Sequence, residues 1–292
     1  MAHLRAYTYS LPLIAPYTTR HGIVIEWPDG RWSEASPLEG WSSDQREDVL
    51  SAWQENRLAA DLPSLQFAMQ ALPMTPKTLS YCALLAGTSA DIFKKASLLK
   101  QEGVHYVKVK LKGIPIEKAI EITRELAKDF RLRIDFNRSL DLITALYFAE
   151  HCQGESIDFF EEPLRNSQEL RHFPFPIALD ESLREEGYEP LIALSQVKAL
   201  VIKPTMTGGL QDWERFGKPI VLSSSFESGI GIAQILLLSA PHHLPPGIDT
   251  YRFLKEDLLE EPLHFESGKV HLPSAFRIKR HLLHWRIRIK ST

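Results

Sequence analysis

Five charged residues stand at the ends of five short apolar runs of the sequence. They are Lys110, Asp135, Glu161, Asp180 and Lys203, and they close the runs VHYVKVK, RLRID, IDFFE, PIALD and KALVIK. Carboxylate oxygens are the ligands that Mg²⁺ prefers, and an amine becomes a base when burial or a neighbouring positive charge lowers its pKa. The set could therefore remove a weakly acidic proton beside a carboxylate while positive charge stabilises the resulting anion.

The spacing of these five residues predicts how they are brought together. The intervals between them are 25, 26, 19 and 23 residues, and each holds a helix-length segment and two short loops. A parallel strand needs a crossover of about a dozen residues or more before the next strand can pair with it. Strands repeating at this interval indicate βα units. If they close into a barrel, their C-terminal ends share one face, where the active sites of such barrels lie.

The three carboxylates are expected to hold a metal ion. Asp135, Glu161 and Asp180 fall on adjacent predicted strands, and this donor set suits octahedral Mg²⁺, for which Mn²⁺ could substitute. Zn²⁺ is not favoured, because no His or Cys stands at a comparable position. Lys108 precedes Lys110 by two residues and so faces the same side of its strand. Its charge would lower the pKa of Lys110.

Composition narrows the class of protein. The chain has 292 residues, enough for one large domain or two modest ones, and a formal net charge of -3. Nucleic acid is not an expected partner, because no strongly basic surface is implied. A membrane is not expected either, since no apolar run approaches the roughly 20 residues of a membrane span. Cys82 and Cys152 show neither metal spacing nor a disulfide framework, which favours the reducing cytoplasm.

The rest of the sequence predicts the elements around these strand ends. Alternation in residues 4–10 and 21–27, with a turn at 28–30, indicates an antiparallel sheet. Barrel strands are predicted at 79–84, 104–110, 131–135, 157–161, 176–180, 198–203 and 219–224, with a brief eighth at 247–250. Helices are predicted at 44–57, 65–72, 89–102, 116–129, 140–152, 167–172, 188–195 and 229–240. Ser89 is the expected N-cap of the third helix.

The prolines at 73 and 76 mark the expected domain boundary. Residues 1–76 would form a first domain and residues 77–250 the barrel. The tail, residues 251–292, shows no βα unit and is expected to pack on the first domain.

Eight runs of the sequence resemble one enzyme family. They are SPLEG (36–40), VKVK (107–110), LRIDFNR (132–138), FFEEP (159–163), ALDES (178–182), VIKPTMTGG (201–209), SSSFESGIG (223–231) and GIDT (247–250). Their order resembles the muconate-lactonizing-enzyme subgroup of the enolase superfamily. The runs VIKPTMTGG and SSSFES are similar, more narrowly, to the o-succinylbenzoate synthases of that subgroup.

The resemblance implies a fold and a reaction. The fold would be α/β, a (β/α)₇β TIM-type barrel with an α+β capping domain. The reaction would be Mg²⁺-dependent loss of water from 2-succinyl-6-hydroxy-2,4-cyclohexadiene-1-carboxylate, giving 2-succinylbenzoate in menaquinone biosynthesis. Lys110 matches the base of the family and Lys203 the opposite lysine, which stabilises the intermediate electrostatically. The three carboxylates match the metal ligands.

Seven further residues are candidates for contacts with the substrate or with the metal ligands. They are Lys108, Arg133, Asn137, Ser224, Ser225, Glu227 and Gly229. Arg133 could orient Asp135 or form an ordinary ion pair within the barrel. The free N–H groups at the start of the apolar helix at 229–240 could hold a substrate carboxylate, or Ser228 could simply cap that helix. Glu162, next to Glu161, is expected to support its neighbour or to form a salt bridge.

Two other functions remain open. One is an N-acylamino acid racemase or dipeptide epimerase of the same superfamily, in which both lysines would act as bases. The other is a non-catalytic binding protein built on the barrel, which would have no need to keep every lysine and carboxylate. A small carboxylate is the expected substrate, and the sequence does not fix the oligomeric state.

Overall fold

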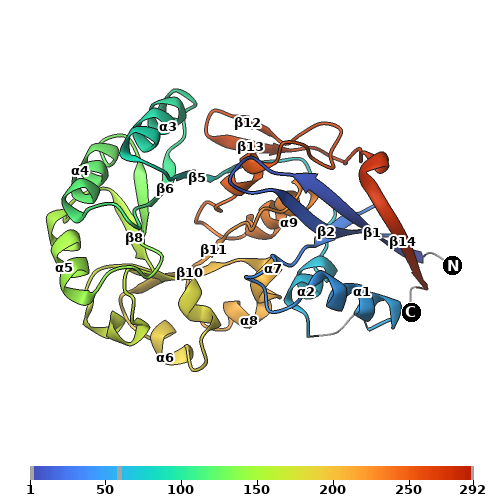
Figure 1. Ribbon diagram of the computed structural model, residues 1–292, viewed down its shortest axis with the longest axis horizontal. Coiled ribbons are helices and arrows are strands. Elements are labelled where there is room, and N and C mark those ends of the chain that lie inside the picture. Colours follow the sequence, from blue (N-terminus) through green and yellow to red (C-terminus); the bar gives the residue numbers. More distant parts are fainter. Residues whose placement is uncertain (1–2, 58–60, 291–292) are drawn as a thin grey trace.

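An antiparallel sheet with two helices forms one side of the molecule (Figure 1). The computed structural model describes residues 3–57 and 61–290. The sheet has the order β14-β1-β2-β3, with strands β1 (His3–Pro12), β2 (Thr19–Glu26), β3 (Trp32–Ala35) and β14 (Leu283–Lys290). The helices are α1 (Arg46–Gln54) and α2 (Pro63–Met69). Because β14 pairs with β1, the tail of the chain completes the sheet that its beginning starts.

A parallel sheet of seven strands forms the barrel. Each strand lies beside its neighbour in the sequence, and the strands are β5 (Cys82–Leu85), β6 (Tyr106–Lys110), β7 (Arg131–Asp135), β8 (Ile157–Glu161), β9 (Ile177–Leu179), β10 (Val197–Ile202) and β11 (Ile220–Leu222). The helices between and after them are α3 (Ser89–Gln101), α4 (Ile116–Leu126), α5 (Leu142–His151), α6 (Glu189–Ile192), α7 (Pro204–Thr207), α8 (Gln211–Glu214) and α9 (Gly229–Ser239). Figure 1 shows α3, α4 and α5 on the outside of the curved sheet. The predicted fold class is confirmed.

Helix α3 illustrates how local sequence sets the ends of these elements. The hydroxyl of Thr88 accepts a hydrogen bond from the N–H of Asp91, and the Asp91 carboxylate accepts one from the N–H of Thr88. This reciprocal pair satisfies two N–H groups that the first turn of a helix leaves free. The predicted cap, Ser89, is therefore wrong by one residue.

The barrel closes through a single residue where a brief eighth strand is predicted. Gly247 forms parallel bridges to Cys82 on one side and to Ser223 on the other. The chain then enters a 3₁₀ helix, η3 (Asp249–Phe253). The prediction of a strand over residues 247–250 is wrong in extent, because this helical turn begins two residues after the bridge.

The first barrel strand is shorter than predicted, because part of the predicted segment belongs to a third, smaller sheet. Its order is β12-β13-β4, with strands β4 (Lys77–Ser80), β12 (His264–Glu266) and β13 (Lys269–Leu272). The predicted strand at 79–84 spans the end of β4 and the start of β5, which belong to different sheets. Tyr81, between them, is buried and packs edge-on against Phe265. Both halves favour strands, so the break is not visible in the sequence.

Other differences concern lengths and short turns. The predicted helices at 44–57 and 188–195 shorten to α1 and to the four residues of α6. The predicted helix at 167–172 is a 3₁₀ helix, η1 (Ser167–His172), and two more 3₁₀ turns are η2 (Glu181–Arg184) and η4 (Arg280–Leu282). In the described ranges, no helix is both long and apolar enough to cross a membrane. The domain boundary at residues 73–76 stays a prediction.

Candidate active site

Strand register places the charged strand ends beside one another. Lys110 pairs with Asp135 across β6 and β7, and Asp135 pairs with Glu161 across β7 and β8. Asp180 follows β9, and Lys203 follows β10. Parallel strands put their C-terminal ends on one face of a barrel. All five residues therefore gather at that face, which is the arrangement that their spacing predicts.

Lysines and carboxylates pair closely at this face. The Lys108 ammonium lies 2.7 Å from Glu161 Oε1 and 3.2 Å from Asp135 Oδ2. Lys203 pairs with Asp180. Lys110 Nζ lies 4.0 Å from Asp135 Oδ2, and its side chain is 40% exposed. The three carboxylates are buried. The side chains of Lys108 and Lys203 are only 17% and 20% exposed, so Lys110 is the most accessible amine of this group.

Burial and neighbouring charge set the protonation of these groups. Burial raises the pKa of Glu161, and the negative charge of Asp135 adds to this rise, while Lys108 opposes it. Burial is also the largest single influence on Asp180 and acts in the same sense, but the positive charges of Lys203 and Lys108, together with the hydrogen bond from Lys203, outweigh it and lower the pKa of that carboxyl. Burial alone would lower the pKa of Lys108, yet Glu161 and Asp135 raise it above its ordinary value. Lys108 is thus a charged partner and a poor base.

The carboxylates suit a hard divalent cation. Within the described ranges, no three His, Cys, Asp or Glu side chains are grouped as a ready metal site, and Lys108 lies against two of the carboxylates. Asp135 Oδ2 is nevertheless a buried oxygen that accepts no hydrogen bond from the described residues. Among those residues, this oxygen faces only the ammonium groups of Lys108 and Lys110, and three carboxylate donors on neighbouring strand ends match what Mg²⁺ binds. The residues present fit the ion.

Glu162 supports the strand end that carries Asp180. Its carboxylate accepts hydrogen bonds from the N–H groups of Asp180 (2.8 Å) and Ser182 (2.7 Å) and from the Ser182 hydroxyl (2.8 Å). Burial raises the pKa of Glu162 to about 8. Glu162 therefore supports the neighbouring loop through hydrogen bonds, whereas an ion pair is the other expectation from the sequence.

Asn137 and Arg133 contact different groups within the barrel. The N–H of Asn137 donates to Asp135 Oδ1 at 2.8 Å, so Asn137 contacts one of the candidate metal ligands. Arg133 is 2% exposed, donates to the carbonyl of Pro245 at 2.7 Å and lies 3.8 Å from Asp158. Of the two roles considered for Arg133, these contacts match the ion pair within the barrel.

The N–H groups at the N-terminus of α9 donate hydrogen bonds to protein side chains. The Gly229 N–H donates to Asp257 Oδ1 at 2.8 Å, and the Gly231 N–H donates to Glu34 Oε2 at 3.0 Å. The Ser228 hydroxyl accepts from the Ile230 N–H at 3.3 Å. These N–H groups are therefore engaged within the protein. Of the two interpretations of this segment, capping matches the contacts better than binding of a substrate carboxylate.

The serines before α9 also have partners. Ser224 Oγ lies 2.5 Å from Thr250 Oγ1, and Ser225 Oγ donates to the sulfur of Met206 at 3.4 Å. The Ser225 N–H donates to Glu227 Oε2 at 2.5 Å, whereas Glu227 Oε1 is buried with no hydrogen-bond partner among the described residues. Burial raises the pKa of Glu227. Contacts of these residues with a substrate stay a prediction.

Two buried charged residues near this loop are not predicted from the sequence. Arg20 is 3% exposed, and Glu34 is fully buried. A signal for Arg20 does exist, because it occupies a buried position in the alternating strand β2. Glu34 falls in a run of five positions, 33–37, that are all buried, so alternation could not single it out.

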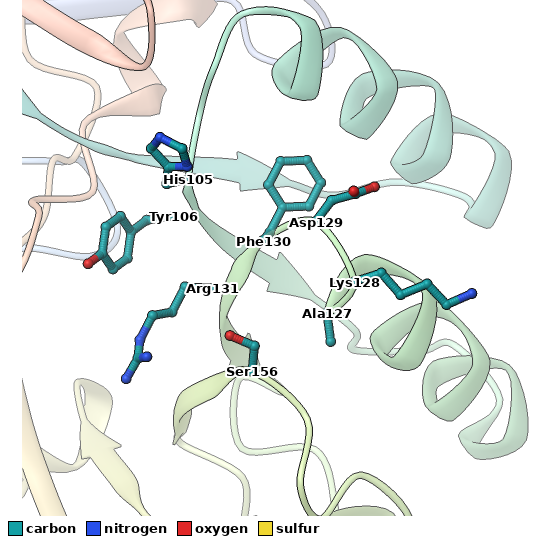
Figure 2. A pocket seen from close by; sticks show the side chains of 8 residues that line it. All are labelled: His105, Tyr106, Ala127, Lys128, Asp129, Phe130, Arg131 and Ser156. Atoms are coloured by element: carbon teal, nitrogen blue, oxygen red, sulfur yellow. The ribbon is translucent and has the colours of Figure 1, made fainter.

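Cavities lie at different places on the molecule. One, of about 630 Å³, is lined by residues within 13–21 and 37–47 and by Phe226. Another, of about 430 Å³, lies at the N-terminal ends of β6, β7 and β8, opposite the charged strand ends. Figure 2 shows its lining side chains: His105, Tyr106, Ala127, Lys128, Asp129, Phe130, Arg131 and Ser156. The first cavity is the one beside the loop that leads into α9.

Known proteins resemble this chain both in sequence and in fold. The family model described as enolase C-terminal domain-like matches residues 91–276. An o-succinylbenzoate synthase of Escherichia coli O1:K1 / APEC is 32% identical, covering 86% of this chain and 91% of that protein.

Two solved structures share the architecture. An L-Ala-D/L-Glu epimerase from Bacillus subtilis superposes with a TM-score of 0.75 at 17% identity, covering 94% of this chain and 96% of that one. An o-succinylbenzoate synthase from Thermosynechococcus elongatus BP-1, complexed with Mg in its active site, superposes with a TM-score of 0.71 at 23% identity, covering 90% and 95%. The chain is an enzyme that belongs to the enolase superfamily, in the same family as the o-succinylbenzoate synthases.

Proposed function

We propose that this enzyme is an o-succinylbenzoate synthase. It would remove water from 2-succinyl-6-hydroxy-2,4-cyclohexadiene-1-carboxylate to give 2-succinylbenzoate, in the cytoplasm and as a step of menaquinone biosynthesis. The main support for the proposal is the pairing of Lys110 with Asp135 and of Asp135 with Glu161 on neighbouring strands. This pairing places a partly exposed amine beside buried carboxylates. The 32% identity to curated synthases supports the choice of substrate.

Lys110 is proposed as the base. In its neutral form, its amine takes the proton from the ring carbon that bears the carboxylate. The electron pair left on this carbon forms a double bond to the neighbouring ring carbon, which bears the hydroxyl. At the same time, the bond between that neighbouring carbon and its hydroxyl oxygen breaks. The leaving oxygen takes the proton back from Lys110 and departs as water. One residue serves both transfers, so proton and hydroxyl leave from the same face of the ring.

Asp135, Glu161 and Asp180 are proposed to hold Mg²⁺, and Mn²⁺ could replace it. When bound, the ion would supply positive charge that stabilises the substrate carboxylate as it gains negative charge. The Mg-bound o-succinylbenzoate synthase of similar fold supports this assignment. Asn137, which donates to Asp135, would keep that ligand oriented.

Lys203 is proposed to act by its charge alone. Its ion pair with Asp180 holds the ammonium group at the barrel mouth, where a fixed cation can stabilise an anionic intermediate. Lys108 would add a second fixed charge, because it is held between Glu161 and Asp135. Proton transfer then depends on Lys110 alone.

Ultraviolet absorbance would test the reaction directly. Purified enzyme with the cyclohexadiene substrate should show the change that accompanies aromatisation when Mg²⁺ is present, and no change with EDTA. Lys110→Ala should abolish the conversion while leaving the far-ultraviolet circular dichroism intact. Lys112→Ala, at an exposed lysine two residues on, is the matched control and should retain activity. Conversion that persists in Lys110→Ala would remove Lys110 as the base.

A second candidate is an epimerase or racemase acting on dipeptides or N-acylamino acids. The presence of lysines at the ends of both β6 and β10, together with the shared fold of the Bacillus subtilis epimerase, favours testing it. Such an enzyme needs both lysines as bases, so Lys203→Arg should abolish deuterium exchange from one enantiomer only. Exchange in deuterium oxide by an enzyme that fails to convert the cyclohexadiene would establish this alternative.

A further inference from the structure

Arg20 is a buried cation whose hydrogen bonds to the described residues all go to backbone carbonyls. Its side chain donates from Nε to Phe226 at 3.2 Å and from Nη1 to His21 at 3.1 Å and Pro37 at 2.8 Å, while Nη2 donates to Ser36. A guanidinium has five N–H groups, so four of them are engaged within the protein. Arg20 is thus poorly suited to bind a substrate carboxylate, although the 630 Å³ cavity lies beside it.

The carbonyls that Arg20 holds belong to three separate parts of the chain. His21 lies in β2, Ser36 and Pro37 begin the loop after β3, and Phe226 lies in the loop between β11 and α9. Two of these parts come from the antiparallel sheet and the third from the barrel. A planar, charged fork is suited to fixing several acceptors at once. Arg20 therefore joins the sheet to the barrel at the edge of the cavity.

An aromatic cluster makes a second connection at the same place. The ring centroids of Tyr17 and Phe226 are 4.8 Å apart, those of Tyr17 and Phe253 5.6 Å, and those of Phe226 and Phe253 5.7 Å. Phe226 has a φ of +65°, which is unfavourable for a bulky residue and persists only when its surroundings hold it. The carbonyl bonded to Arg20 and the ring packed on Tyr17 belong to this same residue.

The loop that Phe226 occupies leads to candidate substrate contacts. Ser224 and Ser225 precede it on the chain, and β11 lies directly beside β10, which leads into Lys203. Within the described part of the chain, Arg20 donates no hydrogen bond to the carboxylates of the barrel mouth. A change at Arg20 would therefore move the walls of the site without altering the groups that transfer protons.

We propose that Arg20 is a positioning residue that, together with the Tyr17–Phe226 ring contact, locks loops 13–18 and 36–42 of the antiparallel sheet to the barrel loop 223–228, and so sets how tightly substrate is held. Without this lock, the three loops open more often, and substrate is bound in a site whose walls are no longer fixed. The kinetic part of this proposal rests on the proposed synthase function, whereas the mechanical part does not.

Hydrogen exchange of Arg20→Met tests the mechanical part. Backbone amides in residues 13–22, 36–42 and 223–228 should all exchange faster, because opening frees the three loops together. Arg31→Met is the matched control, since Arg31 also donates to a backbone carbonyl, that of Ala71, at a different edge of the sheet. The control should leave residues 223–228 unchanged. Faster exchange confined to residues 19–22 in Arg20→Met would overturn the proposal.

Steady-state kinetics test the functional part. Arg20→Met should raise KM about tenfold and leave kcat within about threefold, because binding is weakened while proton transfer is untouched. An equal fall in kcat and kcat/KM would show that Arg20 acts in the transition state and would overturn the positioning role. If no synthase activity is found in the wild-type enzyme, the proposed function fails, while the exchange experiment still decides whether the lock exists.

A milder variant guards against loss of folding. Arg20→Lys keeps the charge but cannot reach four carbonyls with a planar fork. It should show the same pattern of exchange with a smaller increase. If Arg20→Met does not fold, Arg20→Lys decides the question: unchanged exchange in residues 36–42 and 223–228 would overturn the proposal.

Discussion

Glu162 shows how one buried carboxyl can organise a strand end through hydrogen bonds. It receives three hydrogen bonds from Asp180 and Ser182, and its burial favours the neutral form. An acid that is neutral when folded, and ionises more easily when unfolded, links stability to pH. The position of Asp180 therefore depends on a neighbour outside the set proposed to bind metal or transfer protons.

We expect Glu162→Gln to change the pH dependence of stability. The folded pKa of about 8 lies above the ordinary value of 4.5, so the stabilisation is complete below about pH 4.5 and is lost as the pH rises toward 8. Glutamine stays neutral, so the variant should gain stability relative to the wild type between pH 5 and about pH 8. Urea unfolding at intervals across this range measures the difference. Glu150→Gln, at an exposed residue of α5, is the control, and a difference that does not vary with pH would contradict the expectation.

The buried carboxylates predict a response to metal. Mg²⁺ that binds only the folded enzyme should raise its melting temperature, by an amount that grows with concentration. Asp135→Asn removes the charge of a buried carboxylate that is proposed to hold the ion, so the shift should shrink or vanish. Thermal unfolding with Mg²⁺ and with EDTA measures it. Asp158→Asn removes a charge that pairs with Arg131 at the opposite, N-terminal ends of β7 and β8, and it should keep the shift.

Helix α9 depends on residues far from it in the sequence. Glu34 from β3 and Asp257 from the segment after η3 accept hydrogen bonds from the N–H groups of its first turn. Negative side chains are favourable at a helix N-terminus, because its free N–H groups carry partial positive charge. Gly229 allows Asp257 this close approach, since a Cβ on Gly229 would lie 2.3 Å from Asp257 Oδ2 and 2.5 Å from Leu259 Cδ1.

Gly229→Ala should therefore destabilise the enzyme, although alanine is the better helix former. Forcing an extra methyl group into a packed site costs about 1–3 kcal/mol, which outweighs a gain of up to about 1 kcal/mol in helix propensity. Chemical unfolding in urea gives the free energy. Gly209→Ala is the matched control: its Cβ would meet only the amide end of the Gln70 side chain, at 2.7 Å, and this can move aside. A stabilised Gly229→Ala variant would show that Asp257 is free to withdraw.

The antiparallel sheet and the barrel are fastened by a buried polar network. Glu34 accepts hydrogen bonds from the Tyr9 hydroxyl at 2.5 Å and from the N–H groups of Ser228 and Gly231. Gln234 of α9 adds to it, since its side-chain oxygen accepts from the Glu34 N–H at 3.2 Å. Both ends of the chain contribute to the sheet, through β1 and β14. A change that disturbs the packing of the sheet should therefore also shift the loop before α9.

Glu34→Ala should be among the most damaging single changes in the molecule. It leaves buried donors on Tyr9, Ser228 and Gly231 without this acceptor, and each such loss costs about 1–3 kcal/mol. A total of roughly 3 kcal/mol or more is expected in urea unfolding. Glu34→Gln keeps an acceptor oxygen and should cost less. Glu47→Gln, at a carboxylate that is 70% exposed, should change stability little, and equal losses in Glu34→Ala and Glu47→Gln would contradict the network.

Residue order alone predicts the chemical core of this enzyme. The interval between charged strand ends and the alternation within each strand are local properties, and they are enough to place Lys110, Asp135, Glu161, Asp180 and Lys203 on one face of the barrel. Helix ends follow from caps and periodicity to within a few residues. The same reasoning works less well where a strand is a single bridge, as at Gly247, or where two strands abut, as on either side of Tyr81.

Long-range contacts decide the rest, because no local pattern specifies a partner that is far away along the chain. Glu34 and Ser228 are 194 residues apart in sequence, and Arg20 and Phe226 are 206 apart. Their pairing depends on how the sheet is packed against the barrel. From the sequence, the N–H groups in the first turn of α9 could bind a substrate carboxylate. In the folded chain, they donate hydrogen bonds to Glu34 and Asp257 instead. Burial of a charge demands a partner, and only the packed chain determines which partner is within reach.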